Sequence, residues 1–466
     1  MLNKIINFSI KNKLIAFLLT FTITAFGIYA LLNIPLGAVP DITNNQVQVI
    51  TTSKNLSTQD VEQFITYPVE LEMSNLPGVK EIRSISKFGL SVVTIVFEDN
   101  MGTYLPRQLI AEKIKSAAEN IPDGFGTPEM GPISTGLGEI YQYVLDTKPG
   151  YKDQYSTMEL RTIQDWVVKR QLSGIPGVVE VNTWGGFLKQ YEVAVDPEKL
   201  KGFDITLIDV YDALSKNNSV AGGAYIEKQN ETYFIRGDGL VNNLDDIRSI
   251  VIKNENGIPL LVKDVANVQF GSANRFGAIT ANGEGEKVMG QIMMLKDANS
   301  NKVIETVKQR VDEVQKNLPE GVYINPIVER SELIGRTSFT VFENLLIGFI
   351  IIFLVVLLIL GTFRSALVIA SIIPLSMLFT ISLMYIFGID VNLMSLGALD
   401  FGIIIDGAVI IVEFIAVNLT VRNAELDKQK GAGKQKLMDK ITFNGASKMM
   451  NSAIFGQLII LIVFIP

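Results

Sequence analysis

The 466-residue chain contains no cysteine and no histidine. Disulfide bonds are therefore excluded, although the absence of cysteine does not by itself identify a compartment. The two side chains that bind soft transition metals most readily are also missing from this chain. The formal net charge of −7 argues against nucleic acid as a partner, and it is more typical of a solvated outer domain than of an acidic binding face.

Charge is also missing from several long stretches. Hydrophobic residues make up 48% of the chain, and the mean hydropathy is +0.30. A membrane-spanning helix needs roughly 20 apolar residues, and five segments are long enough: 14–39, 344–363, 365–389, 391–420 and 449–466. Four of these segments carry no charge, whereas segment 391–420 carries three acidic residues. The pattern predicts a helical membrane protein.

The first and last apolar segments raise the question of processing and of chain length. The first has the basic start of a signal peptide, with Lys4, Lys11 and Lys13. Its apolar run is too long for a signal core, and no small-x-small cleavage motif follows it, so we expect an uncleaved first span. The last segment reaches Pro466 without a following loop. We therefore expect this chain to be a piece of a longer protein.

Basic residues predict the orientation of the spans, because loops rich in lysine and arginine stay in the cytoplasm. The N-terminus holds three lysines and no acid before Asp41. Residues 421–448 hold seven basic and three acidic residues, and the tight turn before segment 365–389 contains Arg364. Alternating spans put all three stretches on one side. The sequence thus predicts a cytoplasmic N-terminus and a large domain on the outer side.

The outer domain, residues 40–336, contains an internal repeat of mixed α+β sequence. Ser57 and Ser156 each precede an acid by three residues, which is typical of a capping box at a helix start. Pro-Gly pairs at 77–78 and 176–177 end both helices. The two motifs are offset by 99 residues. The repeat predicts two similar helix-on-sheet units flanking a cleft, and the alternative is a chance recurrence of common cap and turn sequences.

Each predicted helix is followed by a stretch rich in β-branched residues. Residues 80–97 break at Gly89, and residues 178–195 break at a Gly-Gly pair, so we expect a hairpin in each unit. Two amphipathic helices also end alike, in Asn-Ile-Pro-Asp-Gly at 120–124 and Asn-Leu-Pro-Glu-Gly at 317–321. Residues 221–268 contain many glycine and asparagine turns, which predict an inserted β-rich module.

The acids of segment 391–420 are Asp400, Asp406 and Glu413. A charge at the bilayer centre costs about 2.5–3.5 kcal/mol, so we do not expect three in one helix for packing alone. In a helix, Asp406 and Glu413 lie on one face about 10.5 Å apart along the axis, with Asp400 about 120° round and about 9 Å from Asp406. Carboxylates at low dielectric can bind and release protons near neutral pH, as a proton relay requires.

Two other interpretations of these acids remain open. They could pair with basic side chains for structure, but none occurs in the five apolar segments, so such a partner has to come from elsewhere. They could also coordinate Na⁺ or a metal ion directly. Gly397, Gly402 and Gly407 lie in the same region and would let a neighbouring helix approach closely.

The acidic trio belongs to the motif Asp-Phe-Gly-x-x-x-Asp-Gly-Ala-Val-x-x-x-Glu at 400–413. This motif resembles the fourth-helix signature of the heavy-metal-efflux branch of the resistance-nodulation-division (RND) superfamily, the CzcA/CusA type. Multidrug RND pumps tend to carry two adjacent aspartates there, whereas this chain has Asp406 followed by glycine. Residues 40–48 and 129–139 resemble that family's entry into the porter domain and its link between porter subdomains. One departure is Phe414, where the family often has asparagine.

The resemblance covers essentially the whole chain and implies its fold. That fold is an α-helical membrane protein with a large α+β periplasmic domain, in which repeated helix-on-sheet porter subdomains carry an inserted β-rich docking module. The implied division is an N-terminal anchor with the first transmembrane helix (1–40), a first porter subdomain (41–133), a second porter subdomain in two parts (134–220 and 271–336), the docking module (221–270), and transmembrane helices 2 to 5 (337–466).

The resemblance also implies a function. It indicates a secondary transporter rather than an enzyme, namely a bacterial inner-membrane pump that exchanges protons for heavy-metal cations, with Asp400, Asp406 and Glu413 as the proton relay. The implied partners are a periplasmic adaptor, an outer-membrane channel and further copies in a homotrimer, with no cofactor and no nucleic acid. Asp400 is typical of pumps for divalent zinc, cobalt or cadmium, whereas copper and silver pumps usually lack it.

The metal-binding residues are not identified by the sequence, because the family's porter metal site lies mostly outside this chain. Met289, Met293 and Met294 form a small group in an apolar strand, for which core packing is the favoured interpretation. Two other functions stay open. A multidrug exporter of the same superfamily would need an aromatic-lined drug pocket. A protein-translocation or scaffold subunit would share the outer domain and the acids but not the link at 129–139.

Overall fold

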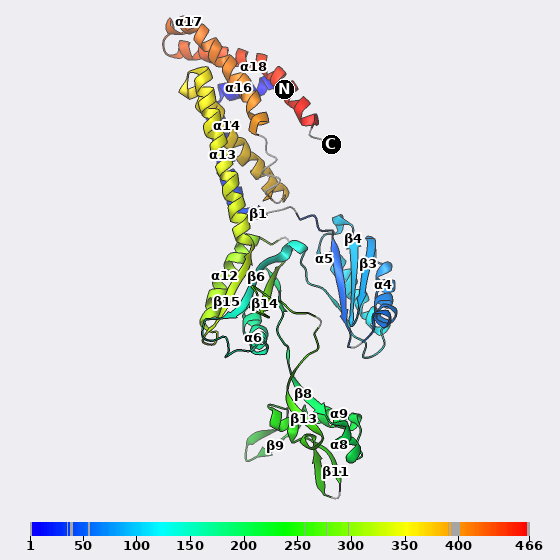
Figure 1. Ribbon diagram of the computed structural model, residues 1–466. Helices are drawn as coiled ribbons and strands as arrows, with labels where there is room; N and C mark the ends of the chain where they lie inside the picture. The colour runs from blue at the N-terminus through cyan, green and yellow to red at the C-terminus, as the bar shows by residue number, and fades with distance from the viewer. Residues whose placement is uncertain are drawn as a thin grey trace.

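The computed structural model describes residues 2–34, 36–37, 41–54, 56–255, 257–275, 277–296, 298–389, 391–392 and 401–463. Figure 1 shows a helical bundle at one end, two α/β units side by side below it, and a smaller β-rich unit at the far end. The chain enters the bundle twice, first with its N-terminal helices and again after the second α/β unit.

The bundle contains the apolar segments predicted from the sequence. They fall on α2 (Lys13–Asn33), α13 (Arg330–Leu360), α14 (Phe363–Phe387), α16 (Phe401–Val421) and α18 (Ala432–Val463). Among the described helices, α2, α14 and α18 are long and apolar enough to cross a membrane, and the apolar part of α13 is the shorter stretch Leu346–Leu360. Short elements complete the bundle: α1 (Leu2–Lys11), α17 (Asn423–Asp427), and the parallel pair β1 (Leu36–Gly37) and β16 (Val391–Asn392).

The first α/β unit is a four-stranded sheet with helices packed on it. Its strand order is β3-β4-β2-β5, with β2 (Gln46–Thr52), β3 (Val79–Lys87), β4 (Leu90–Phe97) and β5 (Pro128–Met130). The helices are a continuous stretch from 58 to 74, made of α3 (Thr58–Val61), a π-helical turn (Glu62–Thr66) and α4 (Tyr67–Ser74), and then α5 (Tyr104–Glu119). A closed apolar core between sheet and helices includes Ile65, Met73, Ile95, Phe97 and Ile110.

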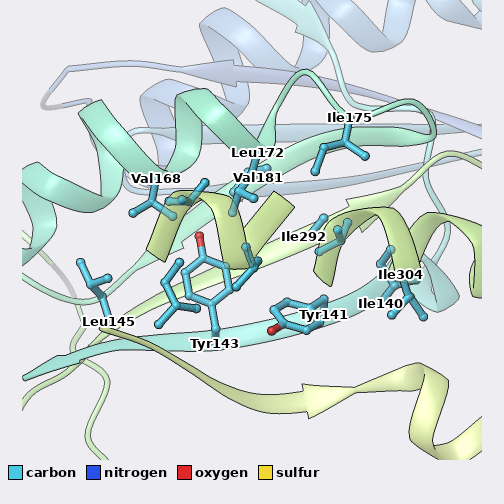
Figure 2. Close-up of a cluster of buried hydrophobic side chains, with 14 of the residues drawn as sticks. Ile140, Tyr141, Tyr143, Leu145, Val168, Leu172, Ile175, Val181, Ile292 and Ile304 are labelled. Carbon is cyan, nitrogen blue, oxygen red and sulfur yellow. The ribbon is translucent and has the colours of Figure 1, made fainter. Parts of the chain in front are cut away.

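The second α/β unit repeats this plan. Its strand order is β15-β6-β14-β7, with β6 (Glu139–Thr147), β7 (Val178–Trp184), β14 (Val288–Met294) and β15 (Val322–Glu329). Its helices are the stretch from 157 to 172, made of α6 (Thr157–Ile163), a π-helical turn (Gln164–Val168) and α7 (Lys169–Leu172), and then α12 (Ser300–Lys316). Figure 2 shows its core, in which the ring of Tyr143 lies among aliphatic side chains from the sheet and the helices.

The two units match strand by strand, which supports the predicted duplication. Both run strand, helix, strand, strand, helix, strand, and β7-β14-β6-β15 has the same order as β3-β4-β2-β5. Both predicted helix starts are also found. Ser57 accepts a hydrogen bond from the amide of Asp60, and Ser156 forms a complete capping box with Glu159.

One predicted hairpin is confirmed and the other is wrong. In the first unit, β3 pairs with β4 across a turn at Gly89. In the second unit, β7 pairs with β14, whereas β8 (Lys189–Val195) pairs with β13 (Ala266–Ser272). The physical reason is an insertion: a separate unit occupies the position of the tight turn, so the two strands that the repeat relates to a hairpin are far apart in sequence.

The inserted unit mixes short strands and helices around its own apolar clusters. Its elements are the β8–β13 pair, α8 (Pro197–Gly202), α9 (Leu207–Lys216), the hairpin of β9 (Ser219–Lys228) and β10 (Glu231–Gly239), α10 (Leu244–Arg248), the hairpin of β11 (Val251–Glu255) and β12 (Ile258–Leu261), and α11 (Val262–Val265). The sequence placed the module at 221–270, and the β8–β13 pairing shows that this unit also includes strand 189–195. The division of the chain into domains stays a prediction.

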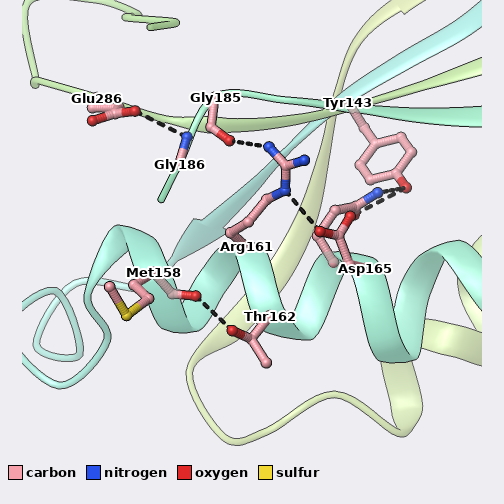
Figure 3. A network of polar contacts seen from close by, with 9 residues as sticks. Tyr143, Met158, Arg161, Thr162, Asp165, Gly185, Gly186 and Glu286 are labelled. Atoms are coloured by element: carbon pink, nitrogen blue, oxygen red, sulfur yellow. Dashed lines mark hydrogen bonds and ion pairs between the residues drawn. The ribbon is translucent and has the colours of Figure 1, made fainter. Parts of the chain in front are cut away.

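Polar contacts hold the two chain segments that join the inserted unit to the second sheet. Arg161 donates to the carbonyl of Gly185 at 2.6 Å and pairs with Asp165 at 2.8 Å, while the carboxylate of Glu286 accepts from the amide of Gly186 at 2.9 Å (Figure 3). Arg275 pairs with the same Glu286. These contacts hold the segment that leads into the inserted unit, at Gly185 and Gly186, against the segment that leads back from it, at Glu286.

Candidate functional site

The candidate site lies on α16, which carries two of the three predicted relay residues. Asp406 and Glu413 both have exposed side chains, as do Ile410 and Val417 on the same stripe of the helix. The two acids therefore share one face, as their spacing predicts. Asp400, the third predicted relay residue, lies outside the described residues.

A second face of α16 is fixed in the bundle. Ile405 is 5% exposed and packs in a cluster with Val356 of α13 and Ile369 of α14. Val409 and Val412 extend this apolar seam along the helix. The acids thus lie on a helix whose core face is held by aliphatic packing, and their own face is left open by the described part of the chain.

A third side of α16 contacts α18 through small residues. A Cβ atom at Gly407 would lie 3.3 Å from Nε2 of Gln457, and one at Gly445 would lie 3.1 Å from Cγ1 of Ile415. Both positions leave little room for a larger side chain, so glycine permits this close helix approach. The prediction that Gly407 serves helix packing is in accord with this geometry.

Charged partners of the acids were expected to come from elsewhere. Within the described ranges, no ion pair links Asp406 or Glu413 to a lysine or arginine. The same residues contain no group of three or more histidine, cysteine, aspartate or glutamate side chains that could hold a metal ion. Phe414, which departs from the family pattern, lies under the ammonium of Lys448 at 5.6 Å.

The stretches predicted to be cytoplasmic lie together at one end of the bundle. Lys13 of α2 pairs with Asp439 of α18 at 2.6 Å, and α1 packs against α18. The N-terminus and α17 lie at the end of the bundle that is remote from the two α/β units (Figure 1). This arrangement agrees with the predicted alternation of the spans.

The stretch 129–139 joins the two α/β units and is held by both. The side chain of Arg107 donates to the carbonyl of Gly131 at 2.8 Å, and Ser134 donates to that of Met294 at 3.0 Å. Asp41 also faces this link. Burial acts to raise the pKa of Asp41, but hydrogen bonds from Thr43 and Thr135, with the charge of Lys296, outweigh it and hold that pKa below its ordinary value.

The methionines of β14 do not form one cluster. Met294 is 8% exposed and belongs to the core of the second unit, whereas Met289 and Met293 are half-buried. Core packing, the favoured interpretation, is therefore confirmed for Met294.

A cleft that the sequence analysis did not single out lies beside β7. It has a volume of about 580 Å³ and is lined by Trp166, Trp184 and basic side chains of the helix from 157 to 172. Trp166 and Trp184 are the two tryptophans of the chain, and the guanidinium of Arg170 stacks 4.1 Å from the ring of Trp166. An arginine four residues after a tryptophan on a helix was the signal that could have found it.

Comparison with known proteins identifies relatives over the whole chain. The chain is 43% identical over 472 residues to the cation efflux system protein CzcA of Alcaligenes sp. (strain CT14), and 43% identical over 472 residues to the cobalt-zinc-cadmium resistance protein CzcA of Cupriavidus metallidurans. Both alignments cover 100% of this chain and 44% of the relative. This chain thus spans less than half the length of these relatives.

A solved structure and a family model agree with these relatives. A crystal structure of a heavy metal efflux pump (crystal form II) superposes with a TM-score of 0.81 at 33% identity, over 97% of this chain and 47% of that chain. The model of the AcrB/AcrD/AcrF family matches residues 5–466. The chain therefore belongs to the AcrB/AcrD/AcrF family of RND efflux transporters, and within it to the heavy-metal-efflux branch of the CzcA/CusA type.

Proposed function

We propose that this chain provides part of a proton-driven exporter of heavy-metal cations. The observation that carries the proposal is the position of Asp406 and Glu413 on one open face of α16, within an apolar bundle. In a membrane-spanning α16, a charge near the bilayer centre would cost about 2.5–3.5 kcal/mol for each group. No described contact of either acid offsets that cost, so a functional role accounts for them better than a structural one.

The proposed role of the acids is proton transfer along α16. Glu413 lies about two helical turns from Asp406, about 10.5 Å along the axis. Asp400, six positions before Asp406 in the sequence, is the third proposed relay residue. Protonation removes the negative charge of a carboxylate, so each proton that Asp406 or Glu413 binds or releases changes the attraction of the open face for positive charge. In this proposal, binding and release of protons on the acids drive the exchange for metal cations, and the protein is an antiporter.

The proposed substrates are divalent cations, with zinc, cobalt or cadmium favoured over copper or silver. Two observations support this preference. Asp400 is present at the first position of the acidic motif, and a relative of 43% identity is named for resistance to cobalt, zinc and cadmium. The residues that bind the metal are not assigned.

The proposed setting is the bacterial inner membrane, with the N-terminus in the cytoplasm and the two α/β units with the inserted unit in the periplasm. Lys13, Arg364 and the basic stretch 422–448 would then all face the cytoplasm, as the positive-inside rule favours. We further propose assembly as a homotrimer with a periplasmic adaptor and an outer-membrane channel, in which the inserted unit serves docking.

The test is neutralisation of Asp406 in the complete protein. We expect Asp406→Asn to reduce zinc resistance of a sensitive host to the level of an empty vector, and to abolish zinc transport driven by an imposed pH gradient in proteoliposomes. The matched control is Asp312→Asn, which removes an exposed carboxylate from α12 of the second unit and should leave both readouts unchanged. Membrane level and oligomer size are measured for both variants.

The melting temperature of Asp406→Asn distinguishes a proton-relay role of Asp406 from a structural one. Asp406 has no described ion pair, so Asp406→Asn should leave the melting temperature equal to or above that of the wild type. Zinc resistance that survives in the variant would reject the relay role. A lower melting temperature with proportionate loss of resistance would show that Asp406 serves structure.

A second candidate, export of hydrophobic compounds, is favoured by one observation. The cleft of about 580 Å³ beside β7 is lined by Trp166 and Trp184, and aromatic side chains are the usual lining of sites for such ligands. Growth in zinc and in a hydrophobic dye separates the two functions. Protection against the dye alone would reject metal export.

A further inference from the structure

The charge of this chain is strongly segregated. Residues 2–13 and 422–448 together hold ten basic and three acidic residues, a net charge of +7, in a chain whose total is −7. Both stretches lie at the same end of the bundle, where α1 packs against α18 (Figure 1). One end of the molecule is therefore strongly basic while the remainder is strongly acidic.

Most of these basic groups are free of acidic partners. Asp427 pairs with Lys434 at 3.0 Å, and Asp439 pairs with Lys13 at 2.6 Å. Among the described residues no ion pair is found for Lys4, Lys11, Arg422, Lys428, Lys430, Lys436 or Lys440, and all seven side chains are exposed. The acids of this end therefore neutralise two lysines and leave a dense positive surface.

Helix α1 adds an apolar component to the same surface. It is amphipathic, with Ile6 buried against the bundle, whereas Ile5 is 57% and Phe8 is 52% exposed. Exposed apolar side chains next to Lys4 and Lys11 are typical of a helix that lies in a membrane interface, with its apolar residues in the acyl boundary and its lysines among the headgroups.

We propose that this basic end, defined as α1 and residues 422–448, binds anionic phospholipid headgroups. Phosphate-bearing lipids complement its charge, and α1 supplies the apolar contact that a soluble anion would not use. The basic stretch begins directly after α16, which ends at Val421, so a membrane-spanning α16 would place its first residues near the headgroups. The proposal rests on the membrane insertion in the proposed function, but not on proton transfer or on the identity of the metal.

The test measures which lipid surrounds the basic end. The complete protein with a single fluorophore-labelled cysteine at Gln429→Cys, between Lys428 and Lys430, is placed in bilayers of phosphatidylcholine with either spin-labelled phosphatidylglycerol or spin-labelled phosphatidylcholine as quencher. One basic residue near a membrane surface is worth about 1 kcal/mol, or about fivefold in association. We therefore expect quenching to favour phosphatidylglycerol by at least about fivefold at low salt.

Removal of four positive charges from the basic end should abolish this preference. Replacement of Lys428, Lys430, Lys436 and Lys440 by glutamine should reduce the ratio at least about fivefold, towards one. Arginine at the same four positions should retain it. The matched control replaces four exposed lysines of the α/β units by glutamine and should have no effect: Lys87, Lys115, Lys152 and Lys316.

The salt dependence of the quenching ratio tests the proposal without any lysine substitution. At 0.5 M salt the screening length falls to about 4 Å, so the ratio of the otherwise unmodified protein should also approach one. Equal quenching by the two lipids at low salt would overturn the proposal, as would an unchanged ratio in the glutamine variant. The lipid test measures quenching and no transport. It can therefore fail while the relay test succeeds, and the relay test can fail while the lipid preference is found.

Discussion

Gly290 of β14 is the position at which one added methyl group should harm the second α/β unit most clearly. The glycine is buried, and a Cβ atom there would lie 2.2 Å from Cζ of Tyr143 and 2.4 Å from its hydroxyl oxygen. Tyr143 is 0% exposed, and its hydroxyl exchanges hydrogen bonds with the amide of Gln164 at 3.0–3.1 Å. The ring therefore has no open space into which it can move.

The expected cost of Gly290→Ala is that of overpacking a closed core. Such insertions cost about 1–3 kcal/mol, and sometimes more. A displaced ring would also leave the buried side chain of Gln164 without its partner, at a further cost of about 1–3 kcal/mol. For a unit of this size 1 kcal/mol lowers the melting temperature by about 2–4 °C, so we expect a fall of roughly 6–12 °C from about 3 kcal/mol.

Intrinsic fluorescence is a suitable assay, because both tryptophans of the chain lie in this unit. The indole of Trp184 donates to Gln291, next to Gly290, at 2.9 Å. A thermal scan of this chain in detergent at fixed heating rate therefore reports on the second α/β unit. The control is Gly348→Ala in α13, where an added Cβ would meet no described atom within 4 Å.

A second substitution tests the steric cause. Tyr143→Leu removes the ring that the new methyl group would meet, so the double variant should be less destabilised than the two single variants added together. Additive losses would refute the clash. A fall of less than about 2 °C in Gly290→Ala would show that the strand shifts at little cost.

Two further predictions concern charged groups outside the membrane. Hydrogen bonds from the amide and the hydroxyl of Ser156 hold the pKa of Glu159 below its usual value, so its stabilisation is complete above pH 4.5 and is lost as the pH falls through the lowered pKa. Glu159→Gln should lower the melting temperature by about 1–2 °C at pH 7, with a difference that shrinks in acid and is followed by a pH series. Lys287, whose side chain is 10% exposed, pairs with Asp146 at 3.0 Å and Glu284 at 2.9 Å. Lys287→Met should lower the melting temperature by about 4–8 °C and speed proteolysis between 273 and 287, with partial rescue by Asp146→Asn. Unchanged cleavage would show that the ion pairs of Lys287 do not hold this segment in place.

The duplicated architecture could be predicted from sequence because its signals are local. A serine followed by an acid, and a Pro-Gly pair after a helix, fix where chain segments start and end. The strand pairing of the second unit could not be read in this way. Strand 178–184 is followed by a glycine pair and another strand, as in a hairpin, and only the long-range pairing with 288–294 shows that a whole unit interrupts the turn.

Helical periodicity likewise predicted the shared face of Asp406 and Glu413, since seven residues make almost two turns. It could not predict that this face is the open one. That outcome depends on which neighbours cover Ile405 and Val409, and these come from α13 and α14. The cleft at Trp166 and Trp184 was missed for the same reason, because its walls meet only in the folded unit.

The geometry of α16 bears directly on how proton binding could do work. Aliphatic side chains hold one face against α13 and α14, and close glycine contacts hold another against α18. A change of charge on Asp406 or Glu413 therefore acts first on whatever covers the open face, because among the described residues no ion pair links either acid to the packed faces. We expect variants of the seam, such as Val409→Ala, to change stability without changing the proton dependence of transport. Variants of the acids should do the opposite. Metal transport measured against an imposed pH gradient, together with melting temperature, separates these two effects.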